Sequence, residues 1–436
     1  MSVAAEVKLC GSRIGVVLLE DGDRNALFQY DPEFIASGIE VAPLMMPLST
    51  NTYRFPGLSW ETFHGLPGLL ADSLPDKFGN SLIDKWLTEQ GRQDGYSFTA
   101  IERLCYTGTR GMGALEFEPA IGPDSTISES LNVEQLVDIA SKILLDREDF
   151  KTKFSTKNDS DAMMQILQVG TSAGGARAKA VIAWNPKTNE VRSGQIAVGD
   201  GFEYWLIKFD GVHNNRDREL ADPRGDGAIE YAYYHMAKDC GVIMNECRLF
   251  NEGDRRHFMT KRFDRLPNGD KLHMQSLAAM AHLDFSMPGI HSYEQVFGIM
   301  RRLDLPTKMM IQMFRRMVFN IVARNHDDHV KNTAFLMDRQ GVWSLAPAFD
   351  ITYSYQKSGR WTSSHQMTLG GKRDGFTMDD FIGCGKTALL RRGQAKNIVD
   401  EIRSIVSRWR YYADASNVIA ARRNEIQNAL RLKSFH

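Results

Sequence analysis

The residues best suited to do chemistry lie in one short stretch of the chain. The segment Asn325–Asn332 reads N-H-D-D-H-V-K-N, and Asp350 follows a short apolar segment further on. An aspartate, an asparagine five positions later and a second aspartate is the order in which kinase catalytic loops present a base and two Mg²⁺ ligands. This order predicts that Asp327 accepts or orients the proton of a substrate hydroxyl. It also predicts that Asn332 and Asp350 supply oxygen ligands to Mg²⁺.

Two alternatives stay open within this segment. Asp328 follows Asp327 directly, and only the five-residue step to Asn332 favours Asp327 as the base. The pair His326-Asp327 also suits an HD-type metal phosphohydrolase, in which His and Asp side chains bind a divalent metal. That interpretation leaves Asn332 and Lys331 without roles, so phosphoryl transfer explains more of the segment.

A lysine and a glycine-rich loop upstream could hold nucleotide phosphates. Lys208 stands among apolar residues in a strand pattern, where its ammonium group can reach a phosphate as a point charge. The plainer alternative is a lysine at a strand end whose head reaches water. Gly174 and Gly175 let backbone N–H groups approach a phosphate without a Cβ in the way, although such a loop is more often a hairpin.

Two further motifs are weaker. Glu230 lies in a predicted helix, 229–240, and could pair with Lys208 as the helix-borne glutamate of protein kinases does, but surface glutamates on helices are far more numerous. The segment 383–387 reads G-C-G-K-T, like the end of a P-loop. A P-loop requires a glycine at position 380, which is Asp380, so this motif is excluded.

Composition indicates an ordinary globular chain. With 436 residues and 43% hydrophobic residues it can bury a large core and divide into two or three domains, since single cores stop growing near ~250–300 residues. The net charge of -1 gives no global electrostatic signature of nucleic-acid binding. From Lys386 to His436, eleven Lys or Arg face four Asp or Glu, which suits either a solvated helix face or a surface for a polyanion or acidic partner.

The cysteines and the apolar runs indicate a location. Five scattered cysteines without a C-x-x-C pair argue against a disulfide framework and a zinc site, so we expect a reducing compartment. The N-terminus lacks a basic region followed by an apolar core, and no apolar run reaches the ~18–20 residues that span a bilayer. We therefore expect a cytoplasmic protein without a membrane partner.

Hydrophobic periodicity predicts an α+β chain. We expect a two-lobed kinase-like fold, with a β-rich N-lobe and an all-helical C-lobe, and an additional small N-terminal α+β domain. The expected domains are 1–120, 121–260 and 261–436. The clearest predicted elements are strands at 13–19, 180–184 and 204–209, helices at 78–87, 133–145 and 305–322, and a strand–turn–strand excursion between Asn332 and Asp350.

These segments together resemble the HipA-type serine/threonine kinase toxins of bacterial type II toxin–antitoxin modules. The resemblance covers most of the chain. Its motifs are L-A-D-S-L-P-D at 70–76, the glycine loop at 172–179, L-I-K at 206–208, R-F-D-R at 262–265, and H-V-K-N at 329–332 with F-D at 349–350. The R-F-D-R and H-x-K-N elements together are specific, whereas the glycine loop alone is not.

The resemblance implies ATP and Mg²⁺ as cofactors and assigns residues to them. Asp327 is the implied catalytic aspartate, and Asn332 and Asp350 are the implied metal ligands. Phe263 is expected against the adenine ring, but Lys261 stands where an acidic residue is expected, which puts a side-chain contact there in doubt. The full implied ATP-binding set is Gly174, Gly175, Ala176, Arg177, Lys179, Lys208, Phe263, His329, Lys331, Asn332 and Asp350.

The resemblance also implies a biological role. Members phosphorylate aminoacyl-tRNA synthetases and so arrest translation and growth. They also autophosphorylate a serine in the phosphate loop, here Ser172, which adds roughly −1.5 to −2 charges beside the ATP site and silences the kinase. The implied partner is a small helix-turn-helix antitoxin that binds operator DNA, so that this chain contacts DNA mainly indirectly.

Two other classes of function remain. One is a catalytically quiet kinase fold that serves as a co-repressor with the antitoxin. The other is a kinase for a small molecule or lipid, because those enzymes use the same geometry of acidic and amide groups. The complete set Lys208, Asp327, Asn332 and Asp350 argues against loss of catalysis, and the sequence does not show the acceptor site.

Overall fold

The computed structural model describes residues 2–89, 98–122, 130–145, 165–167, 169–170, 177–195, 198–212, 225–266, 269–433 and 435. The chain divides into two compact units. Unit 1 comprises Met1–Val41, Met46–Arg224 and Arg248–Met274, and unit 2 comprises Ala42–Met45, Gly225–Cys247 and Gln275–His436. Sheets and helices occur in both, which confirms the predicted α+β class.

The first sheet of unit 1 is built from the N-terminal strands. Its order is β3-β2-β1-β4, with all neighbours antiparallel: β1 (Val3–Leu9), β2 (Ser12–Leu19), β3 (Leu27–Tyr30) and β4 (Leu115–Glu118). The turn between β1 and β2 consists of Cys10 and Gly11, both with positive φ (50° and 82°), which matches the twist of a two-residue hairpin. Helix α5 (Ala100–Thr107) packs on this sheet and begins with a capping box between Thr99 and Glu102.

The second sheet of unit 1 carries the predicted lysine strands. Its order is β6-β5-β7-β9-β8, with β5 (Lys179–Trp184), β6 (Val191–Ser193), β7 (Glu203–Lys208), β8 (Cys247–Glu252) and β9 (Arg255–Lys261). Helices α4 (Lys77–Glu89) and α6 (Val133–Leu145) share its buried core, which includes Leu82, Leu136 and Trp205. The remaining short helices of this unit are α1 (Pro32–Ser37), α2 (Trp60–Phe63) and α3 (Gly68–Ala71).

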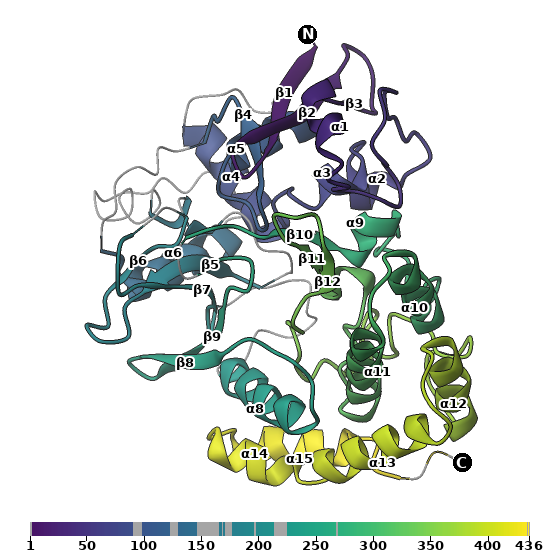
Figure 1. The fold of residues 1–436 in the computed structure, drawn as a ribbon. Helices are drawn as coiled ribbons and strands as arrows, with labels where there is room; N and C mark the ends of the chain where they lie inside the picture. Colours follow the sequence, from purple (N-terminus) through teal and green to yellow (C-terminus); the bar gives the residue numbers. More distant parts are fainter. Residues whose placement is uncertain are drawn as a thin grey trace. The chain divides into compact units, whose positions relative to one another are not determined.

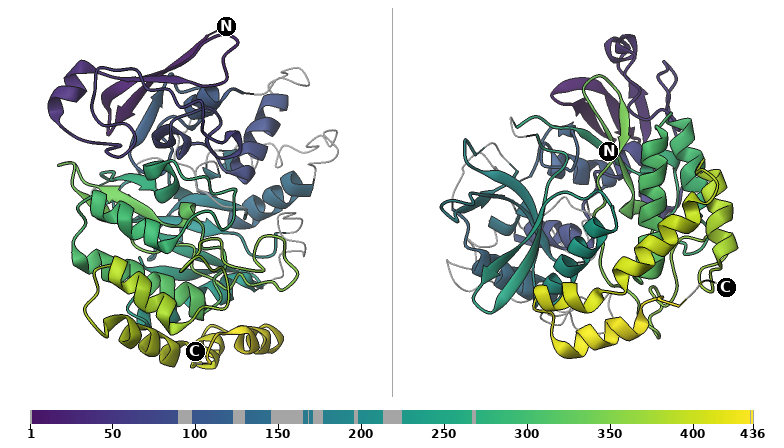
Figure 2. Two further views of the ribbon diagram at one scale, coloured as in Figure 1. Left: turned by 90° about the vertical axis from the view of Figure 1, so that its right-hand side faces the viewer. Right: turned by 60° about the horizontal axis from the view of Figure 1, so that its bottom comes forward.

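Unit 2 is mostly helical. Helix α11 (Thr307–Val322) lies at its centre, with most of its side chains buried. In Figures 1 and 2 the yellow helices α13 (Gln394–Val406) and α14 (Trp409–Ala415) run along one side of this unit, where α13 packs on α11 and α14 packs on α8 (Asp226–Asp239). The other helices are α9 (Leu277–Ala281), α10 (Tyr293–Arg302), α12 (Met378–Thr387) and α15 (Ala420–Ala429).

A small sheet completes the architecture. Strands β11 (Ala334–Met337) and β12 (Trp343–Leu345) pair antiparallel and confirm the excursion predicted before Asp350. The strand β10 (His273–Ser276), where the chain leaves unit 1, lies at the edge of this sheet beside β11. None of the helices in the described ranges is both long and apolar enough to cross a bilayer, and no disulfide joins the cysteines there.

Candidate active site

The end of α11 delivers the chain to the predicted catalytic loop. Arg324 adopts a left-handed conformation (φ 60°), and the Asn325 backbone N–H donates to the Asn320 carbonyl (2.9 Å), as in a Schellman helix end. The Tyr233 hydroxyl donates to the Ala323 carbonyl (2.6 Å), and Arg324 Nε donates to the Ala429 carbonyl (2.7 Å). The first residues of the loop are therefore held by α8 and α15 as well as by α11.

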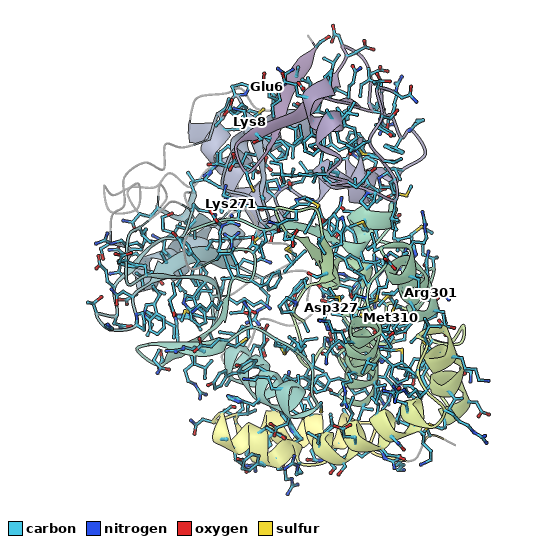
Figure 3. All side chains as sticks on the ribbon, in the orientation of Figure 1. Glu6, Lys8, Lys271, Arg301, Met310 and Asp327 are labelled. Carbon is cyan, nitrogen blue, oxygen red and sulfur yellow. The ribbon has the colours of Figure 1, made fainter. Side chains whose placement is uncertain are left out.

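Asp327 stands in this loop, at the position labelled in Figure 3, and one of its carboxylate oxygens accepts a hydrogen bond. Its backbone N–H donates to Ser354 Oγ (2.9 Å), and its carbonyl accepts from Asn332 Nδ2 (2.8 Å). Its Oδ1 accepts from Trp361 Nε1 (3.0 Å), whereas Oδ2 accepts no hydrogen bond from the described residues. The side chain is 38% exposed. A carboxylate held on one side and open on the other is what a group accepting a substrate proton requires.

Asp328 has the opposite environment. Its side chain is fully buried and accepts from the Tyr293 hydroxyl (2.6 Å), the His365 ring (2.8 Å) and the Gln366 backbone N–H (2.7 Å). Burial raises the pKa of Tyr293 well above its usual range, and the charge of Asp328 raises it further, so the hydroxyl keeps its proton and donates it. With both oxygens occupied, Asp328 is suited to anchor the loop, and this geometry supports Asp327 as the base.

Asn332 and Asp350 carry the oxygens expected for a metal. Asn332 ends a 3₁₀ helix (Val330–Asn332), and its amide nitrogen is committed to the Asp327 carbonyl, so its Oδ1 is the atom left for a ligand. Asp350 follows the β11–β12 hairpin with a positive φ of 56°, a conformation uncommon for residues other than glycine and often found at functional sites.

Asn332 and Asp350 are suited to a Mg²⁺ ion that is shared with substrate phosphates, and less suited to a metal ion held by protein ligands alone. Over the parts of the chain that are described, no three His, Cys, Asp or Glu side chains gather where they could hold a metal ion. Mg²⁺ is usually bound through one or two carboxylates together with substrate phosphates. Burial together with His365 lowers the pKa of His326, whose ring nitrogen Nδ1 lies 3.0 Å from the Thr362 carbonyl.

His329 and Lys331 lie on the same loop beside an aromatic ring. His329 Nδ1 accepts from the Lys331 backbone N–H (3.2 Å), so a neutral ring carries its hydrogen on Nε2, which lies 3.6 Å from Asp327 Oδ1. The Lys331 ammonium lies 4.6 Å from the centre of the Phe285 ring. Their contact with ATP stays a prediction.

In unit 1, Lys208 and Lys179 occupy opposite positions on the paired strands β7 and β5. Both are buried, and Lys179 Nζ lies 3.1 Å from Asp76 Oδ2. Asp76, the last residue of the L-A-D-S-L-P-D segment, also accepts from the Gly79 backbone N–H (2.7 Å) at the start of α4. Like charges directly opposite each other on paired strands are destabilising, and the Asp76 carboxylate beside Lys179 offsets part of this cost. The partner of Lys179 was not evident from the sequence.

The R-F-D-R motif forms a buried clamp. Asp264 accepts from Arg262 (2.8 and 2.6 Å), Arg265 (2.9 Å) and the Gly113 backbone N–H (2.7 Å). The two arginines also donate to the Gly111 carbonyl, and Arg265 to that of Gly113. The motif therefore joins the end of β9 to the segment before β4, a role that the sequence did not indicate.

Several predicted residues are placed only in part. Phe263 is half-buried within the clamp, and Lys261 pairs with Glu203 (2.6 Å). Arg177 is half-buried, whereas Ser172, Gly174, Gly175 and Ala176 lie outside the described residues. Glu230 is buried in α8 of unit 2 and Lys208 belongs to unit 1, so their pairing stays a prediction.

The chain is similar to one protein family over most of its length. The family model for the HipA-like C-terminal domain matches residues 171–409, and the model for the HipA N-terminal domain matches residues 5–118. Among curated proteins, the chain is similar to "Putative kinase Y4dM" of Sinorhizobium fredii, with 26% identity over 156 residues. The aligned part is 34% of this chain and 36% of that protein, about a third of the curated relative.

The chain is also similar to solved structures. One is HipA of the toxin–antitoxin system of Shewanella oneidensis MR-1, solved with HipB and its operator DNA, with 16% identity, a TM-score of 0.66, and coverage of 98% of this chain and 94% of that one. This likeness shows a common fold. The proinflammatory kinase CtkA of Helicobacter pylori aligns with 58% of this chain and 93% of its own, at 12% identity and a TM-score of 0.33.

Proposed function

Because the chain belongs to the HipA family, as the match over residues 171–409 shows, we propose that it is an ATP- and Mg²⁺-dependent serine/threonine protein kinase. We further propose that it is the toxin of a toxin–antitoxin module. The observation that carries the proposal is the environment of Asp327, whose Oδ1 is held by Trp361 while Oδ2 is open, beside an Asn332 with an uncommitted side-chain oxygen. A protein kinase base needs this arrangement, and a packing aspartate such as Asp328 does not.

The proposed reaction transfers the γ-phosphoryl group of ATP to a serine or threonine hydroxyl. The acceptor oxygen attacks the γ-phosphorus, the bond from this phosphorus to the β–γ bridging oxygen breaks, and the hydroxyl proton passes to Asp327 Oδ2. Mg²⁺ bound through Asn332 and Asp350 would neutralise charge on the transferring group. Lys208 would contact the phosphates as a point charge.

The proposed substrate is an aminoacyl-tRNA synthetase, and the proposed partner is a helix-turn-helix antitoxin. The HipA of Shewanella oneidensis was solved with HipB and operator DNA, which supports a similar partner here. Part of the C-terminal basic charge is paired within the chain: Arg403 with Asp400 (3.1 Å), Arg422 with Glu425 (2.6 Å) and Arg423 with Asp414. This internal pairing supports a DNA contact made mainly through the antitoxin.

We also propose that the kinase silences itself by phosphorylating Ser172. Ser172 lies just before the paired glycines of the proposed phosphate loop, where added negative charge opposes ATP binding. Intact-mass analysis after incubation with Mg²⁺ and ATP should show added phosphate in the wild type and none in Ser172→Ala. Equal phosphate gain by both proteins would exclude Ser172 as the site.

The test of the main proposal is transfer of labelled γ-phosphate from ATP to proteins of a cytosolic extract. The wild type should label discrete protein bands, which mass spectrometry then identifies, and Asp327→Ala should label none. Arg54→Ala is a matched control, because this residue forms an exposed ion pair with Asp23 in unit 1 and belongs to none of the predicted motifs. Labelling by Asp327→Ala equal to the wild type would refute the assignment of the base.

A further inference from the structure

One side chain outside the predicted motif reaches the carboxylate of Asp327. Trp361 lies in the segment that follows Asp350, and its Nε1 donates to Asp327 Oδ1 over 3.0 Å. Within the described residues, no other side chain hydrogen-bonds this carboxylate, since His329 Nε2 is 3.6 Å away. The orientation of the proposed base is therefore set by a residue 34 positions away along the chain.

The segment around Trp361 is tied to both neighbours of Asp327. On one side, the Thr362 carbonyl lies 3.0 Å from His326 Nδ1, and burial lowers the pKa of His326, so its neutral ring can donate there. On the other side, Gln366 donates through its backbone N–H to Asp328 (2.7 Å) and through its side chain to the Trp361 carbonyl. These hydrogen bonds hold the segment around Trp361 against the catalytic loop.

The chemistry of the indole defines what this contact can do. An indole N–H is a donor only, so Trp361 can neither remove a proton from an acceptor hydroxyl nor take one from Asp327. A donor at one oxygen fixes the plane of the carboxylate and directs its second oxygen outward. Trp361 occupies Oδ1 alone, and Oδ2 accepts no hydrogen bond from the described residues. The indole therefore leaves Oδ2 available to the acceptor hydroxyl of a substrate.

We propose that Trp361 is a positioning residue, which orients Asp327 so that Oδ2 meets the acceptor hydroxyl. This inference rests on the proposed kinase function and extends it to the segment after Asp350. Positioning a reacting group is a large part of enzymatic rate enhancement. Loss of the indole donor should lower the rate of transfer without weakening the binding of ATP.

The first test replaces the indole N–H alone. Benzothienylalanine at position 361 substitutes sulfur for the nitrogen in a ring of the same shape, and Trp361→Phe keeps an apolar ring. Hydrogen bonds to charged groups are strong enough that kcat should fall about tenfold to a hundredfold. KM for ATP should stay within about twofold, because the lost contact acts on the reacting groups. Trp343→Phe, in strand β12, is the matched control and should keep its kcat.

A second measurement needs no activity. In protein labelled with ¹⁵N-tryptophan, the Trp361 indole resonance is identified by its absence in Trp361→Phe, and it should move when Asp327→Ala removes the acceptor. An unmoved resonance would disprove the contact. A kcat unchanged or raised in both Trp361 variants would overturn the positioning role alone, whereas a wild type that transfers no phosphate would overturn the proposed function and this role together.

Discussion

The R-F-D-R clamp allows a prediction of stability that does not depend on catalysis. Asp264→Asn keeps the shape of the side chain but removes the charge that the buried Arg262 and Arg265 face. The segment it holds leaves little room for adjustment, since Gly113 has a positive φ (75°) and a Cβ there would lie 2.8 Å from the Met274 backbone nitrogen. The substitution therefore leaves two buried guanidinium groups without their counter-charge.

The size of the effect follows from burial. The side chains of Arg262, Arg265 and Asp264 are 1%, 7% and 0% exposed. Breaking a buried ion pair from one side costs about 3–5 kcal/mol of unfolding free energy. Burial opposes ionisation of Asp264, but the charges of the two arginines outweigh it and hold its pKa well below the usual range. The contribution is therefore complete above about pH 4 and is lost as the pH falls through the lowered pKa.

Urea unfolding at pH 7, followed by circular dichroism, measures this loss. The matched control is Asp23→Asn, which makes the same chemical change in an exposed pair with Arg54 (34% and 41% exposed side chains). The control should cost about 0–1 kcal/mol. An Asp264→Asn midpoint and slope equal to those of the control would refute the argument that the clamp stabilises unit 1.

Three further predictions follow from the same structure. Asp327→Ala should abolish phosphate transfer and leave the urea midpoint near that of the wild type. Asp328→Ala should lower the unfolding free energy by on the order of 3 kcal/mol, because three buried donors lose their acceptor. The reverse pattern would exchange the two roles. Asp76→Ala should cost about 3–5 kcal/mol of unfolding free energy, because the buried Lys179 loses the charge of this carboxylate. Adding Lys179→Met should recover most of that loss, so strictly additive effects in this double-mutant cycle would contradict the pairing. Burial lowers the pKa of His273 to about 4, so between about pH 6.5 and pH 4 the unfolded chain binds a proton at this ring and the folded chain does not. As the pH falls through this range, the unfolding free energy should decrease by up to ~1.4 kcal/mol per pH unit. A pH slope unchanged in His273→Gln would rule out this residue as the cause.

The sequence predicted local elements well because their signals are local. The periodicity at 305–322 became α11 (Thr307–Val322), and the excursion before Asp350 became the β11–β12 hairpin. Both signals arise from side chains a few positions apart on one helix face or one strand. The same local reasoning also predicted the strand that bears Lys208, which is β7.

For the candidate site, the sequence predicted only the order in which acidic and amide residues follow one another along the chain. Spacing favoured Asp327 over Asp328, but their environments distinguish them far more sharply, since one carboxylate is 38% exposed and the other fully buried. Burial of a single side chain depends on which elements pack over it. Here Tyr293 and His365 come from segments remote in the chain.

By itself, the sequence determined the α+β class, the helices and strands, and the order in which acidic and amide groups follow one another. Tertiary structure alone decided that Trp361 orients Asp327, that Asp264 reaches Gly113 across 151 positions, and that Lys179 pairs with Asp76. Local periodicity depends on residues close together in the chain. The partner of a buried polar group depends on the packing of the whole unit, because every buried polar group needs a hydrogen-bond partner.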